Sequence, residues 1–404
     1  MKIAVLTSSY PRFPGDGTAP FIQAFCQQLA VYGHQVEVLA PYDPKVTARE
    51  GNNPRLTRFR YYVPDRLHIM GHGRSLAADV RVTPLAYLLL PLYIFAGIQA
   101  LNHLIQRQGS DVIHVHWVLP NGLIAAWVSA IKKTPFIVSL HGSDIYLARK
   151  YRLFGAVARY VFKKAAGLTA CSPELLDAAI KLGAPQNSIL LPYGVDINKF
   201  HPHLRDDSLR EKYAPPEDIL IISVGRLVYK KGFDTLIGAM PAVINEFPDV
   251  RLIIAGEGPL KQSLIQQVRL LGIPEKVNFI GNLPWDQVPA FMACADIFVL
   301  PSVKDRFGNV DGLPNVLLEA MSSGTAVVSS DIPGAMLLIQ NGIHGIAYHA
   351  GDIHGLRDAI IHLLNHPDDR IRLATNARKL MEEEFTWDII GRRLASYIQK
   401  CIPG

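Results

Sequence analysis

Short apolar runs alternate with longer stretches of helical periodicity in both halves of the chain. The runs are rich in Val, Ile and Leu, which is typical of parallel strands covered by helices. We therefore predict an α/β fold with two doubly wound, Rossmann-like sheets. In the first half, the predicted strands cover residues 2–7, 35–39, 111–116, 136–140 and 168–170. In the second half, they cover residues 219–224, 251–255, 277–280, 297–300 and 326–329.

The alternation stops between residues 192 and 216, where four prolines accompany a charged stretch without clear periodicity. We predict a linker there, between an N-terminal domain of residues 1–191 and a C-terminal domain of residues 217–384. The spacing of apolar residues predicts a closing helix at 385–404, which would pack back on the first domain. A chain of 404 residues is long enough for two domains. The expected active site is a cleft between them, with both domains facing it.

Charge is divided unevenly between the two halves. Residues 1–190 carry 20 Lys and Arg against 10 Asp and Glu, a net of +10, whereas residues 191–404 carry 21 against 25, a net of −4. The basic half indicates either a partner with phosphates, such as a membrane surface or an acidic acceptor, or merely a solvated basic surface. The four cysteines lie more than 100 residues apart without a CxxC pair, so neither a zinc site nor a disulfide framework is indicated.

The strongest apolar stretch covers residues 84–98 and contains Pro84 and Pro91. It is shorter than the roughly 20 residues that span a bilayer, so we expect a core helix or, alternatively, an interfacial helix. Six nearby arginines favour contact with an anionic membrane, namely Arg55, Arg58, Arg60, Arg66, Arg74 and Arg81. The first apolar run is too short for a signal peptide. We expect a cytoplasmic protein, with peripheral contact at the inner face of the membrane as the variant.

The first segment with candidate chemistry follows the predicted strand 219–224. Arg226 and Lys231 lie five residues apart beside a glycine turn, so two cations can converge on a diphosphate. The chain has no GxxxxGK, no GxGxxG after its first strand and no Asp-x-Asp, which removes the usual phosphate loops and the simplest metal–diphosphate site. A solvated basic loop is the alternative interpretation of Arg226 and Lys231.

The second segment covers residues 301–321. Gly312 and Pro314 suit a turn into a helix, whose first backbone amides would bind an anion. Asp311 precedes this turn and Glu319 follows it by about one helical turn. Both carboxylates can therefore accept hydrogen bonds from hydroxyls of one ligand.

The spacing Asp311-x7-Glu319, followed by Ala320-Met321 and Gly324, resembles the E-x7-E motif of family 4 retaining glycosyltransferases, which have the GT-B fold. The resemblance covers nearly the whole chain. Its other motifs are Gly15-Asp16-Gly17, His141-Gly142-Ser143-Asp144, Pro192-Tyr193-Gly194-Val195-Asp196, Gly225-Arg226, Lys231-Gly232 and Gly256-Glu257-Gly258-Pro259.

The resemblance implies a metal-independent transfer of a hexose-type sugar from a UDP- or GDP-linked donor, with retention of configuration and without a cofactor. Arg226 and Lys231 would bind the diphosphate, Asp311 the hydroxyls of the sugar, and Glu319 the ribose. Backbone amides near Gly312, Leu313 and Asn315 would complete the donor pocket. Gly17 would let the first loop approach a phosphate, and His141 would face the sugar. The family usually has Glu where this chain has Asp311, which is one methylene shorter. This difference implies either that the first carboxylate reaches the sugar less directly or that the donor sugar differs.

Residues of the acceptor side are expected in the first domain. His116 and Trp117 end a strand and either line an acceptor cleft or pack inside the domain, and Asp144 is a third candidate. The acceptor would be a glycan, a lipid-linked sugar or a small molecule, and no nucleic-acid partner is expected. Two alternatives remain at this point. One is a nucleotide-sugar-binding regulatory subunit with weak catalysis, and the other is a GT-B sugar phosphorylase or epimerase.

Overall fold

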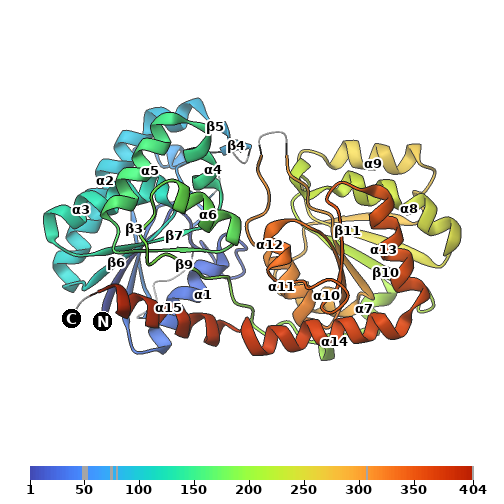
Figure 1. The fold of residues 1–404 in the computed structure, drawn as a ribbon. Helices are drawn as coiled ribbons and strands as arrows, with labels where there is room; N and C mark the ends of the chain where they lie inside the picture. The colour runs from blue at the N-terminus through green and yellow to red at the C-terminus, as the bar shows by residue number, and fades with distance from the viewer. Residues whose placement is uncertain (48–52, 73–75, 79–80, 306–307, 403–404) are drawn as a thin grey trace. The chain divides into compact units, whose positions relative to one another are not determined.

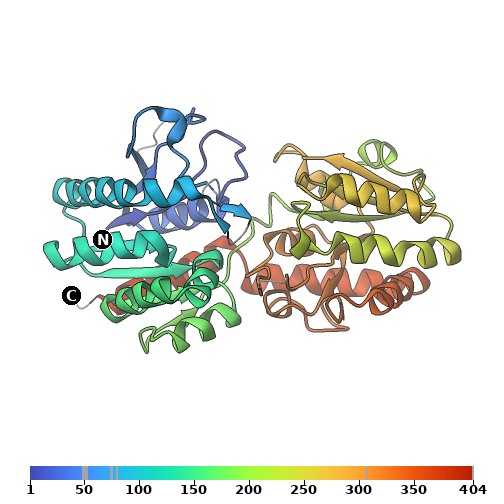
Figure 2. The ribbon, with the colours of Figure 1, turned by 90° about the horizontal axis from the view of Figure 1, so that it is seen from above.

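The computed structural model describes residues 1–47, 53–72, 76–78, 81–305 and 308–402. The chain divides into two compact units, of which the first is Met1–Tyr193 with Trp387–Gly404 and the second is Gly194–Thr386. Each unit contains a parallel sheet with helices on both faces (Figures 1 and 2). The predicted α/β class with two doubly wound sheets is confirmed.

The first unit contains a seven-stranded parallel sheet. Its strands are β1 (Lys2–Leu6), β2 (Gln35–Pro41), β3 (Arg55–Phe59), β6 (Val112–His116), β7 (Phe136–Leu140), β8 (Gly167–Ala170) and β9 (Ile189–Leu190). They are ordered β3-β2-β1-β6-β7-β8-β9, and β4 (Leu76–Ala78) with β5 (Arg81–Val82) forms a separate antiparallel pair. The helices are η1 (Asp65–Leu67), α1 (Pro20–Val31), α2 (Pro84–Gln108), η2 (Val118–Gly122), α3 (Leu123–Lys132), α4 (Ser143–Lys150), α5 (Arg152–Lys164), α6 (Pro173–Lys181) and α15 (Trp387–Cys401). Helix α15 packs against α1.

The second unit contains a six-stranded parallel sheet. Its strands are β10 (Ile219–Val224), β11 (Val250–Ala255), β12 (Val277–Gly281), β13 (Ile297–Leu300), β14 (Ala326–Ser330) and β15 (Ile346–Tyr348), in the order β12-β11-β10-β13-β14-β15. The longer helices are α8 (Phe233–Glu246), α9 (Lys261–Leu270), α10 (Val288–Cys294), α11 (Asn315–Ser322), α13 (Ile353–Asn365) and α14 (Pro367–Glu384). The short ones are η3 (Pro202–Leu204), α7 (Asp207–Glu211), η4 (Tyr229–Lys231) and α12 (Pro333–Met336). Apolar residues of β10, β11 and β13 pack against α8 and α13 in the core.

Each predicted strand corresponds to an observed one. All but the edge strand β12 are central strands, which are buried on both faces and therefore form continuous apolar runs. Strands β3, β9 and β15 were not predicted. All three lie at an edge of their sheet, where one side of the strand has no neighbour. Strand β3 reads Arg-Leu-Thr-Arg-Phe and β9 and β15 have only two and three residues, so the apolar signal is weak.

The predicted linker at 192–216 differs from the observed division. Residues 194–216 belong to the second unit, and buried Arg210 fixes them there. Its guanidinium donates to the carbonyl oxygens of Cys294 at 2.8 Å and Asp218 at 2.6 Å, and to the Asp296 carboxylate at 2.8 Å. The packing of this segment is not evident from its composition. It depends on a buried ion pair, whereas packed segments are usually recognised by apolar periodicity.

Helix α2 is longer than the apolar stretch predicted at 84–98. It has 25 residues with Pro91 inside, and by length and composition alone it is the one helix in the described part of the chain that could cross a membrane. Only 28% of its most apolar window is buried. One face packs on α3, β1, β2 and β3, while Leu85, Leu88, Leu92 and Phe95 are exposed. The helix is therefore a core helix along one face only.

Candidate active site

Several of the predicted site residues follow strands that lie at the point in each sheet where the strand order reverses. This point lies between β1 and β6 in the first unit and between β10 and β13 in the second. Parallel strands of this order bind ligands beyond their carboxyl ends at such a point. Gly17 follows β1 and His116 ends β6, whereas Lys231 follows β10 and Asp311 follows β13.

Lys231 and Asp311 meet in the second unit. The Lys231 Nζ lies 2.7 Å from Asp311 Oδ2, and the Lys230 Nζ lies 3.6 Å from Oδ1. Ser302 Oγ also donates to Oδ2 at 2.9 Å. Burial alone would raise the pKa of Asp311, but the two ammonium groups hold it below its ordinary value. The site therefore contains an ionised carboxylate with two cations. Lys230 and Ser302 were not singled out from the sequence, although both lie in the quoted segments.

Glycines let three loops pack closely around these cations. Gly232 has φ +63°, and a Cβ there would lie 1.9 Å from the Pro301 carbonyl oxygen, so only glycine allows η4 to lie against the end of β13. A Cβ on Gly256 would lie 1.9 Å from the Gly225 oxygen, beside the exposed Arg226. The turn that carries Arg226 is therefore held by backbone packing.

Helix α11 begins beside the same cations. Within the described chain, no side chain caps its start, so its first amides are available to an anion. A Cβ on Gly334 would lie 1.8 Å from the Gly312 oxygen, so the turn before the helix is held against α12. The side-chain oxygen of Asn315 is buried without a hydrogen-bond partner among the described residues. Leu313 is buried in this turn.

Glu319 lies one turn into α11 and is half-buried. Burial raises its pKa to about 7, although the charge of Lys199 acts in the opposite direction. The Lys199 Nζ lies 4.4 Å from the centre of a Trp285 ring, within cation–π distance. Lys199 was not predicted as a site residue, because it lies in the stretch that was assigned to the linker.

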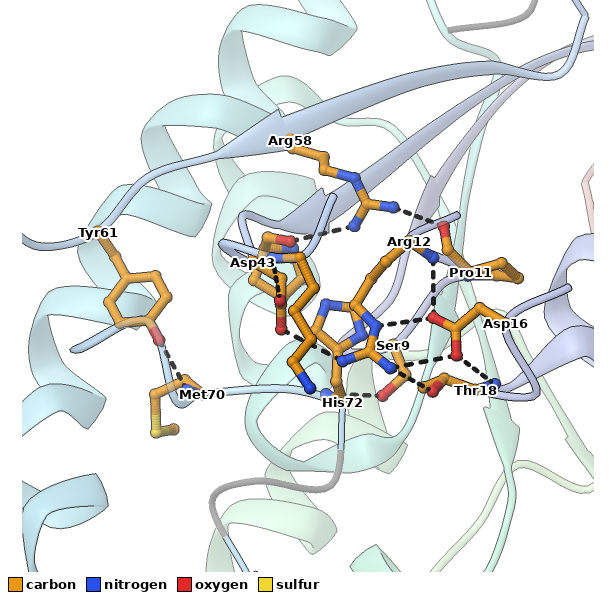
Figure 3. Close-up of polar contacts among 12 residues, drawn as sticks. Ser9, Pro11, Arg12, Asp16, Thr18, Asp43, Arg58, Tyr61, Met70 and His72 are labelled. Carbon is orange, nitrogen blue, oxygen red and sulfur yellow. Dashed lines mark hydrogen bonds and ion pairs between the residues drawn. The ribbon is translucent and has the colours of Figure 1, made fainter. Parts of the chain in front are cut away.

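The loop between β1 and α1 is fixed by an ion pair (Figure 3). Arg12 Nε donates to Asp16 Oδ2 at 2.7 Å, and Asp16 Oδ1 accepts from the Thr18 amide at 3.1 Å. Asp43 lies 3.7 Å from the guanidinium of Arg12. Gly17 lies between Asp16 and Thr18 in this loop, and a Cβ at position 17 would meet nothing within 4 Å. Protein packing therefore does not require a glycine at position 17.

His141 belongs to a partly buried chain of hydrogen bonds. Its Nε2 lies 2.9 Å from His116 Nδ1, and its Nδ1 lies 2.8 Å from the Tyr193 hydroxyl. Burial lowers the pKa of His141 to about 3, so the ring is neutral near pH 7. Both ring nitrogens are used by protein groups, whereas the sequence suggested a histidine directed at the sugar. His116 is fully buried inside the unit.

Trp117 and Asp144 instead line a cavity of about 240 Å³ in the first unit. Asp144 is buried, and its Oδ2 accepts a hydrogen bond from the Val118 amide at 2.6 Å. Burial raises the pKa of Asp144 to about 6. Trp117 has φ +65°, a conformation that residues other than glycine rarely adopt. The acceptor-side candidates thus separate into packed His116 and cavity-lining Trp117 and Asp144.

No group of three or more His, Cys, Asp or Glu side chains suited to a metal ion occurs in the described ranges. Metal independence stays a prediction.

Comparison with known proteins gives the family. Residues 205–380 match the family model for glycosyl transferases group 1, and residues 16–194 match the glycosyl transferase 4-like domain. A GDP-mannose-dependent alpha-(1-6)-phosphatidylinositol monomannoside mannosyltransferase of Mycobacterium tuberculosis is 30% identical over 52% of this chain and 55% of that protein. The aligned part of the chain therefore spans about half the length of that relative.

Two further similarities extend over nearly the whole chain. The N-acetyl-alpha-D-glucosaminyl L-malate synthase of Bacillus anthracis is 24% identical over 95% of this chain and 93% of that protein. The crystal structure of Anabaena HepE in complex with UDP has a TM-score of 0.78 at 21% identity, covering 99% of this chain and 100% of that chain. This similarity shows the GT-B fold. With both of its halves matched by glycosyltransferase models, the chain belongs to the group 1 glycosyl transferases.

Proposed function

We propose that the protein transfers a hexose-type sugar from a UDP- or GDP-linked donor to a hydroxyl acceptor, without a metal ion and with retention of configuration. The observation that carries the proposal is the contact between Lys231 and Asp311. It joins the basic loop after β10 to the segment that leads into α11. Cations, uncapped helix amides and two carboxylates then lie along one edge of one sheet.

The roles follow from the charges that develop during transfer. Departure of the nucleoside diphosphate builds negative charge on its phosphates, and Arg226, Lys231 and the α11 amides would stabilise that charge. Asp311 would accept hydrogen bonds from sugar hydroxyls while its own charge keeps Lys231 in place. Glu319 would accept hydrogen bonds from the ribose hydroxyls. None of these steps requires a group from outside the chain.

The relatives favour these donors without choosing between them. One relative is described as dependent on GDP-mannose, and the Anabaena structure contains UDP. A catalytic role for His141 through a free ring nitrogen would need one of its two hydrogen bonds to break. We therefore assign His141 a positioning role. His141 holds Tyr193 by a hydrogen bond, and Phe21 stacks on Tyr193 with 4.4 Å between ring centres. These three rings form part of the edge of the first sheet.

We also propose peripheral contact with an anionic membrane at a cytoplasmic face. The exposed residues Leu85, Leu88, Leu92 and Phe95 follow one stripe of α2. The arginines need correction, since Arg58 is half-buried and donates to the Pro11 and Pro41 carbonyl oxygens at 2.7 and 3.3 Å. Arg60 pairs with Asp65. Arg55 and Arg66 are exposed, whereas Arg74 and the side chain of Arg81 lie outside the described residues.

The direct test is to incubate the protein with UDP- and GDP-hexoses, with water taking the place of the hydroxyl acceptor, and to follow the released sugar by ¹H NMR. We expect release of nucleoside diphosphate with the anomeric configuration of the donor retained. Release of the opposite anomer would contradict the retaining mechanism, and no release from any donor would contradict the proposed activity.

A further inference from the structure

The walls of the cavity in the first unit are mainly apolar, although Ser8, Ser9 and Asp144 also line it. It is bounded by α2, η2, α4 and α5, and its lining includes Met70, Leu90, Ile94, Leu123, Leu147 and Phe154. Its volume is about 240 Å³. An apolar protein cavity of about 150 Å³ already binds a benzene ring. The cavity is therefore large enough for an apolar group of that size or larger.

Asp144 places one carboxylate in these apolar walls. Its side chain is 2% exposed, and Oδ2 is satisfied by the Val118 amide at 2.6 Å. Oδ1 has no hydrogen-bond partner among the described residues. An acceptor atom that is buried without a donor is costly, so native structures rarely leave one unmatched. This unsatisfied oxygen indicates a ligand that brings a donor into the cavity.

Trp117 forms the wall beside Asp144. Its φ of +65° is fixed by a hydrogen bond from its amide to the Ser139 oxygen at 3.0 Å. The indole contacts the ring of His141, with ring centres 5.0 Å apart. A residue held in this rare conformation at a cavity wall is typical of a ligand site. Through this ring contact, the wall formed by Trp117 packs against His141 at the edge of the sheet.

We propose that this cavity binds the acceptor of the transfer reaction, and that the acceptor is a hydroxyl compound with an apolar group. The hydroxyl donates to Asp144 Oδ1, and the apolar group fills the space between α2 and α5. The inference rests on the proposed transferase function. The apolar group is either the chain of a lipid or the aromatic ring of a small molecule, and both present the same chemistry to the cavity.

The test measures binding of simple probes to the full-length protein. The probes are 1-alkanols from butanol to decanol for a chain, and phenol for a ring. Hexane and toluene are the matched probes without a hydroxyl. We expect alkanol affinity to rise about fourfold for each added methylene until the cavity is full. A preference for phenol without this rise would assign the site to an aromatic acceptor.

Two variants separate the apolar space from the carboxylate. Leu90→Trp fills the cavity and should weaken binding of all the probes at least tenfold. Leu153→Trp on α5, at a position that is 72% exposed, is its size-matched control and should bind the probes as the wild type does. Asp144→Asn can still accept from the Val118 amide through its side-chain oxygen, but it presents an amide NH₂ where Oδ1 was. This variant should bind alkanols and phenol more weakly than the wild type does, whereas its affinity for hexane and toluene should be unchanged.

Thermal melting of each variant checks the fold, and Ile94→Trp replaces Leu90→Trp should that variant fail to fold. Equal probe affinity in the wild type and in the folded cavity-filling variant would overturn the inference. Efficient transfer to a polar glycan acceptor by both proteins would also overturn it, while the proposed function stands. Failure of the proposed function has a different signature, because no nucleotide sugar would then be hydrolysed by the wild type.

Discussion

The ammonium of Lys231 lies 2.7 Å from the carboxylate of Asp311, although 80 residues separate them in the chain. The contact forms because β10 and β13 are neighbours at the point where the strand order reverses. The contact keeps Asp311 ionised, since the two lysines lower the pKa of its carboxyl group. A cation is thereby held where a departing diphosphate would need it.

Lys231→Ala should lower kcat/KM by a factor equivalent to about 2 to 4 kcal/mol of transition-state stabilisation. Arg226→Ala should have a similar effect. The fold should persist, because Lys230 and Ser302 still contact Asp311. Lys261→Ala is the control, since that lysine pairs with Glu257 at the protein surface. The measurement is kcat/KM of each variant from steady-state kinetics with the preferred donor. Near-normal kcat/KM in both site variants would rule out the diphosphate role.

Glu319→Gln should change how stability depends on pH. The folded pKa of about 7 lies above the ordinary value of 4.5, so the folded state holds more protons than the unfolded state between these values. Stability of the wild type therefore falls as pH rises from 4.5 to 7, whereas glutamine does not titrate. We expect the Tm of the variant relative to the wild type to increase across this window and then level off. A difference that is the same at pH 4.5 and pH 8 would contradict the raised pKa.

Gly17→Ala should impair substrate binding without impairing folding. Its added methyl group meets no protein atom within 4 Å, so Tm should stay within about 1 °C of the wild type. We expect a rise in KM for donor or acceptor of at least fivefold. Gly15→Ala is the contrasting variant, because φ +81° at that position strains any other residue. It should lower Tm, and unchanged KM in Gly17→Ala would remove position 17 from the site.

Glutamine at both Leu88 and Phe95 should reduce binding to vesicles that contain anionic lipid, because these side chains are exposed on α2. Arg55→Gln with Arg66→Gln should reduce the salt sensitivity of binding. Ile180→Gln on α6 serves as the control for removal of an exposed apolar side chain. Arg58 is unsuitable for this test, since its guanidinium holds the loop after β1. A wild type that does not sediment with vesicles at any salt concentration would contradict membrane contact.

The sequence predicted the central strands because burial on both faces leaves a continuous apolar run, as in Ile297–Leu300. It also predicted which loops carry charge, since Arg226 and Lys231 directly follow such a strand. It did not predict side-chain pairing across the sheet. The two hydrogen bonds of His141 are made with His116 and with Tyr193, which lie 25 and 52 residues away. Lys199 acts on Glu319 from a stretch without periodicity. Such contacts depend on tertiary packing, which local patterns do not encode.

Under the proposed function, Arg226, Lys231 and the start of α11 bind a nucleoside diphosphate without a metal. The most direct measurement is a thermal-shift titration of UDP, GDP and ADP in the presence of EDTA, with the wild type and the variant that combines Arg226→Ala and Lys231→Ala. A ligand at free concentration c that binds only the folded state stabilises it by RT ln(1 + c/Kd), so Tm rises as the ligand concentration exceeds Kd. We predict that one nucleotide raises the Tm of the wild type in EDTA and does not raise that of the variant. A shift that appears only after magnesium or manganese is added, or one that is equal in both proteins, would contradict the account.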